Sequence, residues 1–263
     1  MDLQLKSKTA FISGSTQGIG SAIARQLLAE GARVIINGRT QEKVDEAVAN
    51  LKRDNSSAKV SGIATDFANT DEINKLLSAL PEIDILINNV GIFDLKDFSE
   101  LTDEEWYRFF EINVMSGIRL SRALLPKMLS RGWGRVIFIS SESGLNIPEN
   151  MIHYGMTKTA MLSLSNGLSK LTKNTAVTVN TILGGPTYSE GVAQAVEQIA
   201  QAQNITVEQM KQAIMQNTNP HSLIQRFIEP AEIASLATYL SSPLSIATNG
   251  ATLRADGGTL QVI

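Results

Sequence analysis

Short apolar runs alternate with segments of helical periodicity along most of the chain. The apolar runs predict strands over residues 9–13, 34–36, 60–63, 83–87, 136–139, 177–182 and 251–254. The segments between most of these runs are long enough for helical crossovers, and this alternation predicts a parallel sheet. No linker, repeat or low-complexity segment divides the 263 residues, so we expect a single domain over residues 1–263.

Two capping boxes mark predicted helix starts. Thr102 with Glu105, and Thr206 with Gln209, have the spacing in which two side chains reciprocally satisfy free backbone N–H groups. The first predicts one long helix, which ends near Arg131 and carries an asparagine near its middle.

Three glycines, Gly14, Gly18 and Gly20, lie between the first predicted strand and the first predicted helix. Glycine allows a tight turn and a close approach of the backbone to a ligand. The bare N–H groups of a following helix N-terminus suit a pyrophosphate. The spacing G-x-x-x-G-x-G therefore predicts a nucleotide site, although an ordinary strand-to-helix turn has a similar composition.

Tyr154 and Lys158 lie four residues apart in a predicted helix, so their side chains share one face. A phenol titrates near pH ~10. A neighbouring ammonium favours the phenolate, which would lower the pKa of Tyr154. Such a pair can act as general acid or base toward a carbonyl or alcohol. Alone, the spacing is common on solvated helix surfaces.

Composition excludes several kinds of site. The chain has no cysteine and two histidines, so thiol chemistry and His- or Cys-rich metal sites are not expected. The net charge is -3 without a basic block, which disfavours nucleic acid as a partner. There is no signal-peptide core and no apolar run long enough for a bilayer, so we expect a cytoplasmic protein without membrane contact.

Five features in this order resemble the short-chain dehydrogenase/reductase family. They are the segment Ser13–Gly20, the segment Asn88–Gly91, Asn113, Ser141 and the pair Tyr154-x-x-x-Lys158. Each is weak alone, but their joint occurrence is specific. The resemblance implies a Rossmann-like, doubly wound, seven-stranded parallel sheet with helices on both faces. It also implies NAD or NADP binding and a homo-oligomer, either a tetramer or a dimer.

The resemblance assigns roles to four catalytic residues. Tyr154 would be the general acid in carbonyl reduction and the base in the reverse reaction. Lys158 would lower the pKa of Tyr154 and hold the hydroxyl groups of the nicotinamide ribose. Ser141 would hydrogen-bond the substrate oxygen, and Asn113 would hold a water that links Lys158 to solvent. Alternatively, Asn113 back-bonds to its own helix and Ser141 is only a strand-end serine.

The resemblance also implies a set of cofactor contacts. Asp66 would accept a hydrogen bond from the adenine amino group, or else it is a helix cap or a solvated loop carboxylate. Gly184 replaces a proline that is common in the family. His153 either touches substrate or is a partly exposed helix residue. The expected contacts are Gly14, Ser15, Thr16, Gln17, Gly18, Ile19, Gly20, Arg39, Asp66, Phe67, Asn88, Gly91, Tyr154, Lys158, Gly185 and Thr187.

The choice between NADP and NAD depends on the stretch after the second strand. NAD enzymes place a carboxylate there to hold the ribose 2′-hydroxyl. Here Arg39 follows without a carboxylate in residues 36–40, and Ser15 and Thr16 could add hydroxyl donors to a 2′-phosphate. Gln17 stands where many NADP-preferring relatives carry a cation. We favour NADP over NAD.

The segment of residues 188–227 is longer than a simple connection requires, which is typical of substrate lids. It could also be a packed helical excursion. We therefore expect an NADP-preferring oxidoreductase acting on a small carbonyl or secondary alcohol. The alternatives are an NAD-dependent alcohol dehydrogenase of the same fold and a nucleotide-binding regulator without turnover.

Overall fold

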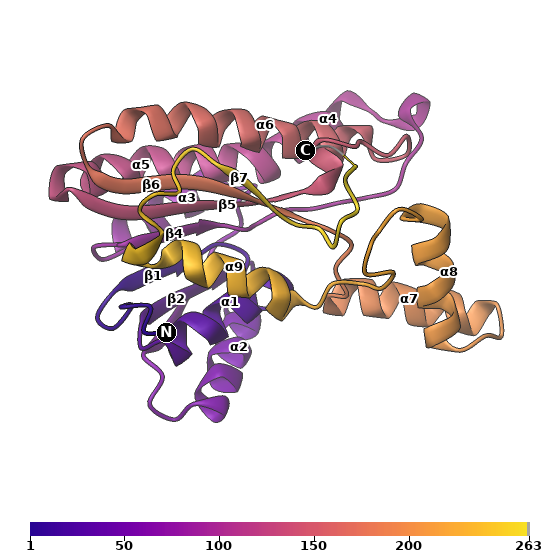
Figure 1. Ribbon diagram of the computed structural model, residues 1–263, viewed down its shortest axis with the longest axis horizontal. Helices are drawn as coiled ribbons and strands as arrows, with labels where there is room; N and C mark the ends of the chain where they lie inside the picture. The colour runs from indigo at the N-terminus through magenta and orange to yellow at the C-terminus, as the bar shows by residue number, and fades with distance from the viewer. Residues whose placement is uncertain (262–263) are drawn as a thin grey trace.

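A seven-stranded parallel sheet forms the centre of the molecule (Figure 1). The computed structural model describes residues 1–261. The strand order is β3-β2-β1-β4-β5-β6-β7, which confirms the doubly wound sheet expected from the sequence. The strands are β1 (Thr9–Ile12), β2 (Arg33–Gly38), β3 (Val60–Ala64), β4 (Ile85–Asn88), β5 (Trp133–Ser141), β6 (Ala176–Gly184) and β7 (Thr252–Ala255).

Helices cover both faces of this sheet (Figure 1). Successive side chains of a strand point to opposite faces. Ile12, Ile87 and Ile137 accordingly pack with α1, α2 and α9, whereas Phe11, Leu86 and Val136 pack with α3, α5 and α6. The helices are α1 (Gly18–Ala29), α2 (Gln41–Asp54), α3 (Thr70–Ala79), α4 (Asp103–Phe110), α5 (Ser116–Arg131), α6 (Ile152–Ser169), α7 (Glu190–Ala202), α8 (Val207–Thr218) and α9 (Pro230–Ser241).

Both predicted capping boxes are present, at Thr102 with Glu105 and at Thr206 with Gln209. The long helix predicted after Thr102 is present and reaches Arg131. It contains an unpredicted π-helical turn over Glu111–Met115, which includes Asn113 and separates α4 from α5. The apolar pattern continues through this turn, so the sequence gives no sign of the break. Such turns occur frequently at functional sites.

The strand order changes direction between β1 and β4. β2 and β3 lie to one side of β1, and β4 to β7 lie to the other. In open parallel sheets, ligands bind in the crevice outside the carboxyl ends of the strands at such a point. A ligand site is therefore expected among the residues that follow β1 and β4.

The helices α7 and α8 form a hairpin beside the main body (Figure 1). Val196, Ala200 and Met210 give this hairpin a small apolar cluster of its own. A parallel bridge between Thr187 and Ile228 closes the base of the excursion. Within residues 1–261, no helix combines the length and the apolar character needed to cross a membrane.

Candidate active site

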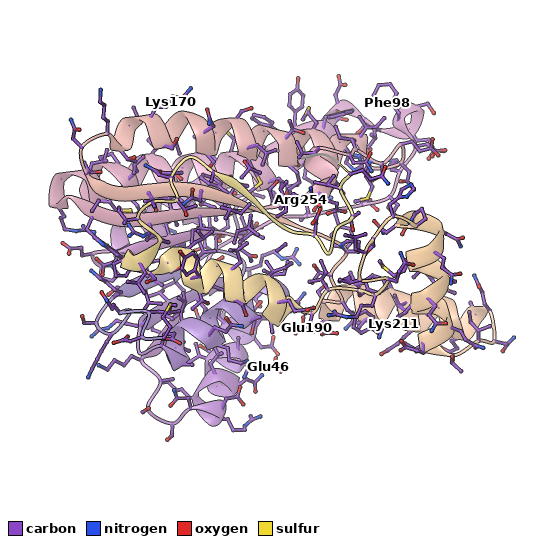
Figure 2. All side chains as sticks on the ribbon, viewed as in Figure 1. Glu46, Phe98, Lys170, Glu190, Lys211 and Arg254 are labelled. Atoms are coloured by element: carbon purple, nitrogen blue, oxygen red, sulfur yellow. The ribbon has the colours of Figure 1, made fainter. Side chains whose placement is uncertain are left out.

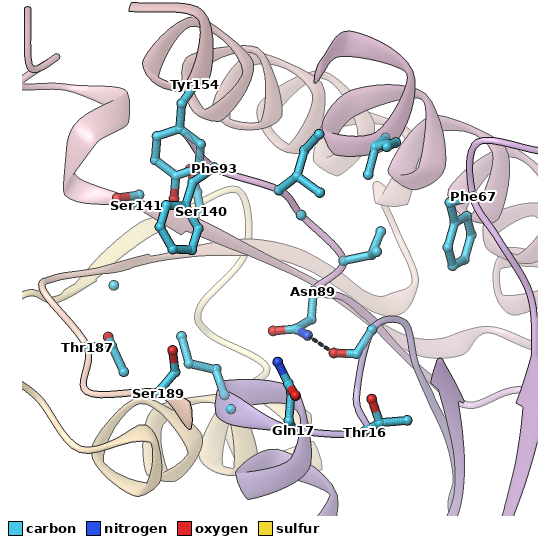
Figure 3. A pocket seen from close by; sticks show the side chains of 18 of the residues that line it. Thr16, Gln17, Phe67, Asn89, Phe93, Ser140, Ser141, Tyr154, Thr187 and Ser189 are labelled. Atoms are coloured by element: carbon cyan, nitrogen blue, oxygen red, sulfur yellow. Dashed lines mark hydrogen bonds between the residues drawn. The ribbon is translucent and has the colours of Figure 1, made fainter. Parts of the chain in front are cut away.

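A cleft of about 570 Å³ opens at the carboxyl ends of β1, β4, β5 and β6. Tyr154 and Ser141 lie at one end of it, and Thr16 and Gln17 lie at the other (Figure 3). Twelve of the expected contacts line it: Gly14, Thr16, Gln17, Gly18, Ile19, Arg39, Asp66, Phe67, Gly91, Tyr154, Gly185 and Thr187.

The glycine turn has the conformation that its glycines predict. Gly14 and Gly18 have φ angles of +60° and +59°, which favour glycine. A Cβ on Gly20 would lie 2.6 Å from Nδ2 of Asn89. Gly20 therefore lets α1 approach the segment after β4, although it does not line the cleft itself.

Asn89 fixes this turn, and sequence reasoning missed it. Its Nδ2 donates to the carbonyl oxygens of Ser13 and Gly14 at 3.0 and 2.7 Å. Asn88 is buried in the sheet instead, where its Nδ2 donates to Oγ of Ser121 at 3.3 Å. The doubled asparagine was a signal that one of them holds the turn, but the sequence alone does not tell which one faces the cleft.

The N-terminus of α1 contacts a carboxylate. The side chain of Gln17, which precedes the helix, caps none of its N–H groups. The N–H of Gly18 donates instead to Oε2 of Glu190 at 2.7 Å, where α7 meets the main body (Figure 2). A carboxylate oxygen here is the chemical stand-in for a phosphate oxygen, so the turn suits the pyrophosphate of a dinucleotide.

Ser15 does not face the ligand side of this turn. Its buried Oγ donates to the Ile12 carbonyl at 2.7 Å and accepts from the N–H of Asn37 at 3.0 Å. The hydroxyl is thus committed to joining β1 and β2. Lys43, which was not anticipated, lines the cleft beside Arg39 and adds a second cation at this end.

At the opposite end, β5 ends in Ser141 and α6 presents Tyr154 beside it (Figure 3). Lys158 is one helical turn further along α6, with Nζ 5.5 Å from the centre of the Tyr154 ring. Its ammonium is buried below the cleft and donates to the Ile139 carbonyl at 3.0 Å. The three residues expected to move a proton are therefore brought together.

The pKa of Tyr154 is raised, contrary to the lowering expected from its lysine neighbour. Burial is the main cause, and the nearby Glu142 carboxylate adds to it, while a hydrogen bond with the Ser141 side chain acts in the opposite direction. Burial also lowers the pKa of Lys158 to about 8. At neutral pH the phenol is therefore protonated, as a general acid must be before it gives its proton away.

Asn113 connects three segments around this site. Its Oδ1 accepts from the N–H of Ile92 at 2.8 Å, and its Nδ2 donates to the Ile92 carbonyl and to Oγ1 of Thr157, both at 3.0 Å. The alternative of back-bonding to its own helix is not observed. Asn113 holds the loop after β4 against the π-helical turn and α6.

Other expected residues form the walls of the cleft. Phe67 is buried at the edge of the cleft. Asp66 also lines the cleft, and its Oδ1 accepts a hydrogen bond from the N–H of Ala68 at 3.0 Å. Thr187 donates to the Gly185 carbonyl at 2.8 Å. A Cβ on Gly185 would lie 2.7 Å from the Asp256 carbonyl oxygen, so only glycine fits there.

His153 is not partly exposed, and it does not line the cleft. It is fully buried, with its ring 4.2 Å from that of Phe109 and 6.2 Å from that of Trp106, centre to centre. Neither ring nitrogen has a hydrogen-bond partner among residues 1–261. Burial lowers its pKa, opposed by the charges of Asp94 and Glu105 and reinforced by that of Lys96.

We expect His153 to make the protein less stable in mild acid. Below the unfolded-state pKa of ~6.5 the unfolded chain binds a proton that the folded protein does not, so the unfolding free energy falls as the pH drops. His153→Leu keeps an apolar side chain of similar size without titrating. Its Tm should fall less than that of the parent between pH 7.5 and 5 in thermal unfolding. Parallel Tm profiles would contradict this role.

Comparisons with known proteins agree with the geometry. The model of the family described as short chain dehydrogenase matches residues 8–200. Uncharacterized oxidoreductase YvaG of Bacillus subtilis is 47% identical over 263 residues, which covers 100% of both chains. D-beta-hydroxybutyrate dehydrogenase of Cupriavidus necator is 32% identical over 258 residues, or 97% of this chain and 98% of its own.

Solved structures are similar along the whole chain. L-sorbose reductase from Gluconobacter frateurii, in complex with NADPH and L-sorbose, has a TM-score of 0.93 at 28% identity, with 100% of each chain covered. An actinorhodin polyketide ketoreductase variant with NADPH has a TM-score of 0.87 at 27% identity and covers 97% of this chain and 98% of its own. With the glycine turn and the Ser141, Tyr154 and Lys158 cluster in one cleft, the chain belongs to the short-chain dehydrogenase/reductase family and is an NAD(P)-dependent oxidoreductase.

Proposed function

We propose that the protein is an NADP-preferring reductase of a small carbonyl compound, and that it oxidises the corresponding secondary alcohol in the reverse direction. The observation that carries the proposal is the Tyr154 phenol beside Ser141, in the same cleft as the glycine turn (Figure 3). A general acid and an anion site at opposite ends of one cleft suit a dinucleotide with a carbonyl compound beside its reactive end.

When bound, the nicotinamide cofactor supplies the hydride that adds to the carbonyl carbon. Tyr154 gives its phenolic proton to the carbonyl oxygen, so that the C=O bond becomes a CH–OH group and the cofactor is oxidised. Ser141 donates a hydrogen bond to the same oxygen and stabilises the charge that develops on it. In alcohol oxidation the phenolate takes the hydroxyl proton back.

Lys158 and Asn113 support this proton transfer. The Lys158 ammonium stabilises the phenolate that Tyr154 leaves after each reduction. Its remaining donors are available to ribose hydroxyls from below the cleft. Asn113 positions the loop above Lys158, and it would also hold a water through which the phenol regains its proton.

Two observations support NADP over NAD. Arg39 and Lys43 line the far end of the cleft, and β2 ends in Gly38 without a carboxylate. A guanidinium fork suits a 2′-phosphate, whereas a carboxylate at this point would suit the free ribose hydroxyls of NAD. The sorbose reductase and the ketoreductase named above were both solved with NADPH.

Arg39→Asp tests this preference. It removes a cation from the 2′-phosphate and introduces an acceptor for the ribose hydroxyl. NADPH affinity should fall more than ~10-fold, the equivalent of one charge-assisted hydrogen bond, while NADH affinity changes far less. Fluorescence titration with both cofactors measures this. Arg33→Asp, which alters an exposed arginine outside the cleft, is the matched control. Equal loss for both cofactors would contradict the assignment.

One assay distinguishes the proposed function from its two alternatives, an NAD-dependent dehydrogenase and a regulator without turnover. A panel of ketones, aldehydes, acyl thioesters and ketoses is tested with NADPH and NADH, and cofactor oxidation is followed at equal cofactor concentration. The proposal predicts turnover with at least one carbonyl compound and higher kcat/KM with NADPH. Higher kcat/KM with NADH would favour the NAD-dependent dehydrogenase. Cofactor binding without turnover across the panel would favour a regulator.

The structure of residues 188–227 supports the proposal that this segment is a lid over the cleft. Thr187, Ser189 and Val192 line the cleft, while α7 and α8 pack mainly on each other. Glu190 occupies the N–H of Gly18, which the pyrophosphate also needs, so the cofactor would displace this contact. A segment with few contacts to the body opens at low free energy.

If this segment is a lid, cofactor and substrate together should slow amide exchange in α7 and α8 more than in α5, which does not line the cleft. Hydrogen–deuterium exchange with mass spectrometry measures the change. Exchange that is already slow without ligand and does not change on binding would support a packed excursion instead.

Family resemblance further supports a homo-oligomer in the cytoplasm. Tyr107 and Phe110 expose aromatic rings on α4, as a subunit interface would require. Light scattering of the purified protein tests the assembly, and a monomeric mass at micromolar concentration would contradict it.

A further inference from the structure

A carboxylate, Glu142, lies directly beside the proposed reaction centre. It follows Ser141 at the end of β5 and lines the cleft with Tyr154. Its Oε2 accepts from Oγ of Ser141 at 2.7 Å, and its Oε1 accepts from Oγ of Ser143 at 3.2 Å. Among residues 1–261 it forms no ion pair with a lysine or arginine.

The charge of Glu142 acts on the reacting groups. It raises the pKa of both Tyr154 and Lys158, so it is electrostatically coupled to the pair that moves the proton. Burial raises the pKa of Glu142 itself, and its hydrogen bonds with Ser141 and Ser143 oppose this. In its ionised form Glu142 repels a substrate that carries a negative charge next to its carbonyl group. Keto acids are therefore poor candidates for the substrate.

Ser141 cannot serve Glu142 and the substrate at once. Its single hydroxyl proton is donated to Glu142, while its Oγ accepts from the N–H of Ser143 at 3.1 Å. When Ser141 turns to donate to a carbonyl oxygen, Glu142 loses a donor. Ser143 still donates to Oε1, but Oε2 then lacks its donor in the cleft, which is costly unless the substrate supplies one.

A hydroxyl group on the carbon next to the carbonyl can replace that donor. The two oxygens of an α-hydroxy ketone are held by adjacent carbon atoms, so their spacing is close to the length of one hydrogen bond. Ser141 and Glu142 are themselves joined by one hydrogen bond. The carbonyl oxygen can therefore lie against Ser141 and Tyr154 while the hydroxyl group donates to Glu142.

Resting on the reductase function proposed above, we propose that Glu142 selects neutral ketones that carry a hydroxyl group on the carbon adjacent to the carbonyl. The substrate class is then the α-hydroxy ketones, which include ketoses. A site built to bind a substrate hydroxyl group discriminates strongly against the analogue that lacks it, because its own polar group is then left without a partner.

Three small ketones test this assignment with NADPH as cofactor. Hydroxyacetone carries the adjacent hydroxyl group, butanone has a methyl group of similar size in its place, and pyruvate has a carboxylate in place of the whole hydroxymethyl group. In the parent protein, kcat/KM should be at least ~10-fold higher for hydroxyacetone than for butanone, and lowest for pyruvate.

Variants identify the residue that is responsible. Glu142→Ala should reduce the preference for hydroxyacetone over butanone to within ~3-fold, because the acceptor is gone. Glu142→Gln keeps an acceptor without the charge, so it should retain part of the preference and improve the kcat/KM for pyruvate relative to butanone. Glu149→Gln is the matched control, since it removes the charge of an exposed carboxylate outside the cleft, and its preference should match that of the parent.

Several results would overturn the assignment. Equal kcat/KM for hydroxyacetone and butanone in the parent would do so without any variant. An equal loss for both ketones in Glu142→Ala would show that Glu142 only holds Ser141. If that variant does not fold by circular dichroism, the parent ratio and Glu142→Gln decide. A parent that reduces butanone without preference overturns only this inference, whereas a parent that reduces no carbonyl compound with either cofactor overturns the proposed function itself.

Discussion

Replacing Tyr154 with phenylalanine should lower turnover by at least ~10²-fold, the lower end of what a positioned general acid contributes. The substitution removes the proton that is transferred and keeps the ring on α6. The glycine turn and Lys158 remain, so cofactor affinity should change little. Steady-state rates on the best carbonyl substrate, together with cofactor titration by fluorescence, measure both quantities.

Tyr239→Phe is the matched control for this experiment. It removes a phenolic hydroxyl from an exposed tyrosine on α9, and its turnover should equal that of the parent. If Tyr154→Phe retains near-parental turnover, the proposed mechanism is wrong. A large loss of cofactor affinity in the same variant would instead indicate that the phenol mainly holds the cofactor.

Lys158→Met should lose both turnover and cofactor affinity. Methionine fills much of the buried space of the aliphatic stem, so packing should survive, but the ammonium is removed. The phenolate of Tyr154 then lacks a stabilising charge, so alcohol oxidation should shift its pH optimum upward. Rates across pH in the oxidation direction and cofactor titrations on this variant measure both effects.

Lys170→Met, which alters an exposed lysine just after α6, is the control for Lys158→Met. An unchanged pH optimum with normal cofactor affinity would contradict a role for Lys158 in proton transfer. Loss of affinity alone would assign to Lys158 only the holding of the cofactor.

Features encoded by local spacing could be predicted from the sequence. Tyr154 and Lys158 share a helix face because they are four residues apart, and Gly14 and Gly18 adopt positive φ because the turn requires it. The alternation of apolar runs and helices was sufficient for the parallel sheet. The roles of the catalytic residues came from the family resemblance and stay predictions until the variants are measured.

Features that depend on tertiary contacts could not be predicted. Ser15 faces inward because β2 offers the N–H of Asn37 to its hydroxyl, and nothing in the local sequence shows this. The π-helical turn at Asn113 forms where the side chain reaches Ile92, 21 residues earlier in the chain. His153 is buried because Phe109 and Trp106 pack against it from another helix.

The direction of the pKa shift of Tyr154 could not be predicted from the sequence either. Sequence spacing reveals the ammonium of Lys158 but not the burial of the phenol or the charge of Glu142, and burial decides the direction. A raised pKa keeps the phenol protonated but makes it a weaker acid, so proton transfer depends on the Lys158 ammonium to stabilise the phenolate.

The most direct test of the central claim follows the hydride itself. The protein is incubated with NADPH that carries deuterium at both C4 positions and with the best ketone of the panel, and the alcohol product is analysed by mass spectrometry and proton NMR. Direct hydride transfer predicts one deuterium per product molecule, bound to the former carbonyl carbon. An alcohol product without deuterium at that carbon, or NADPH oxidation without any alcohol product, would contradict the account.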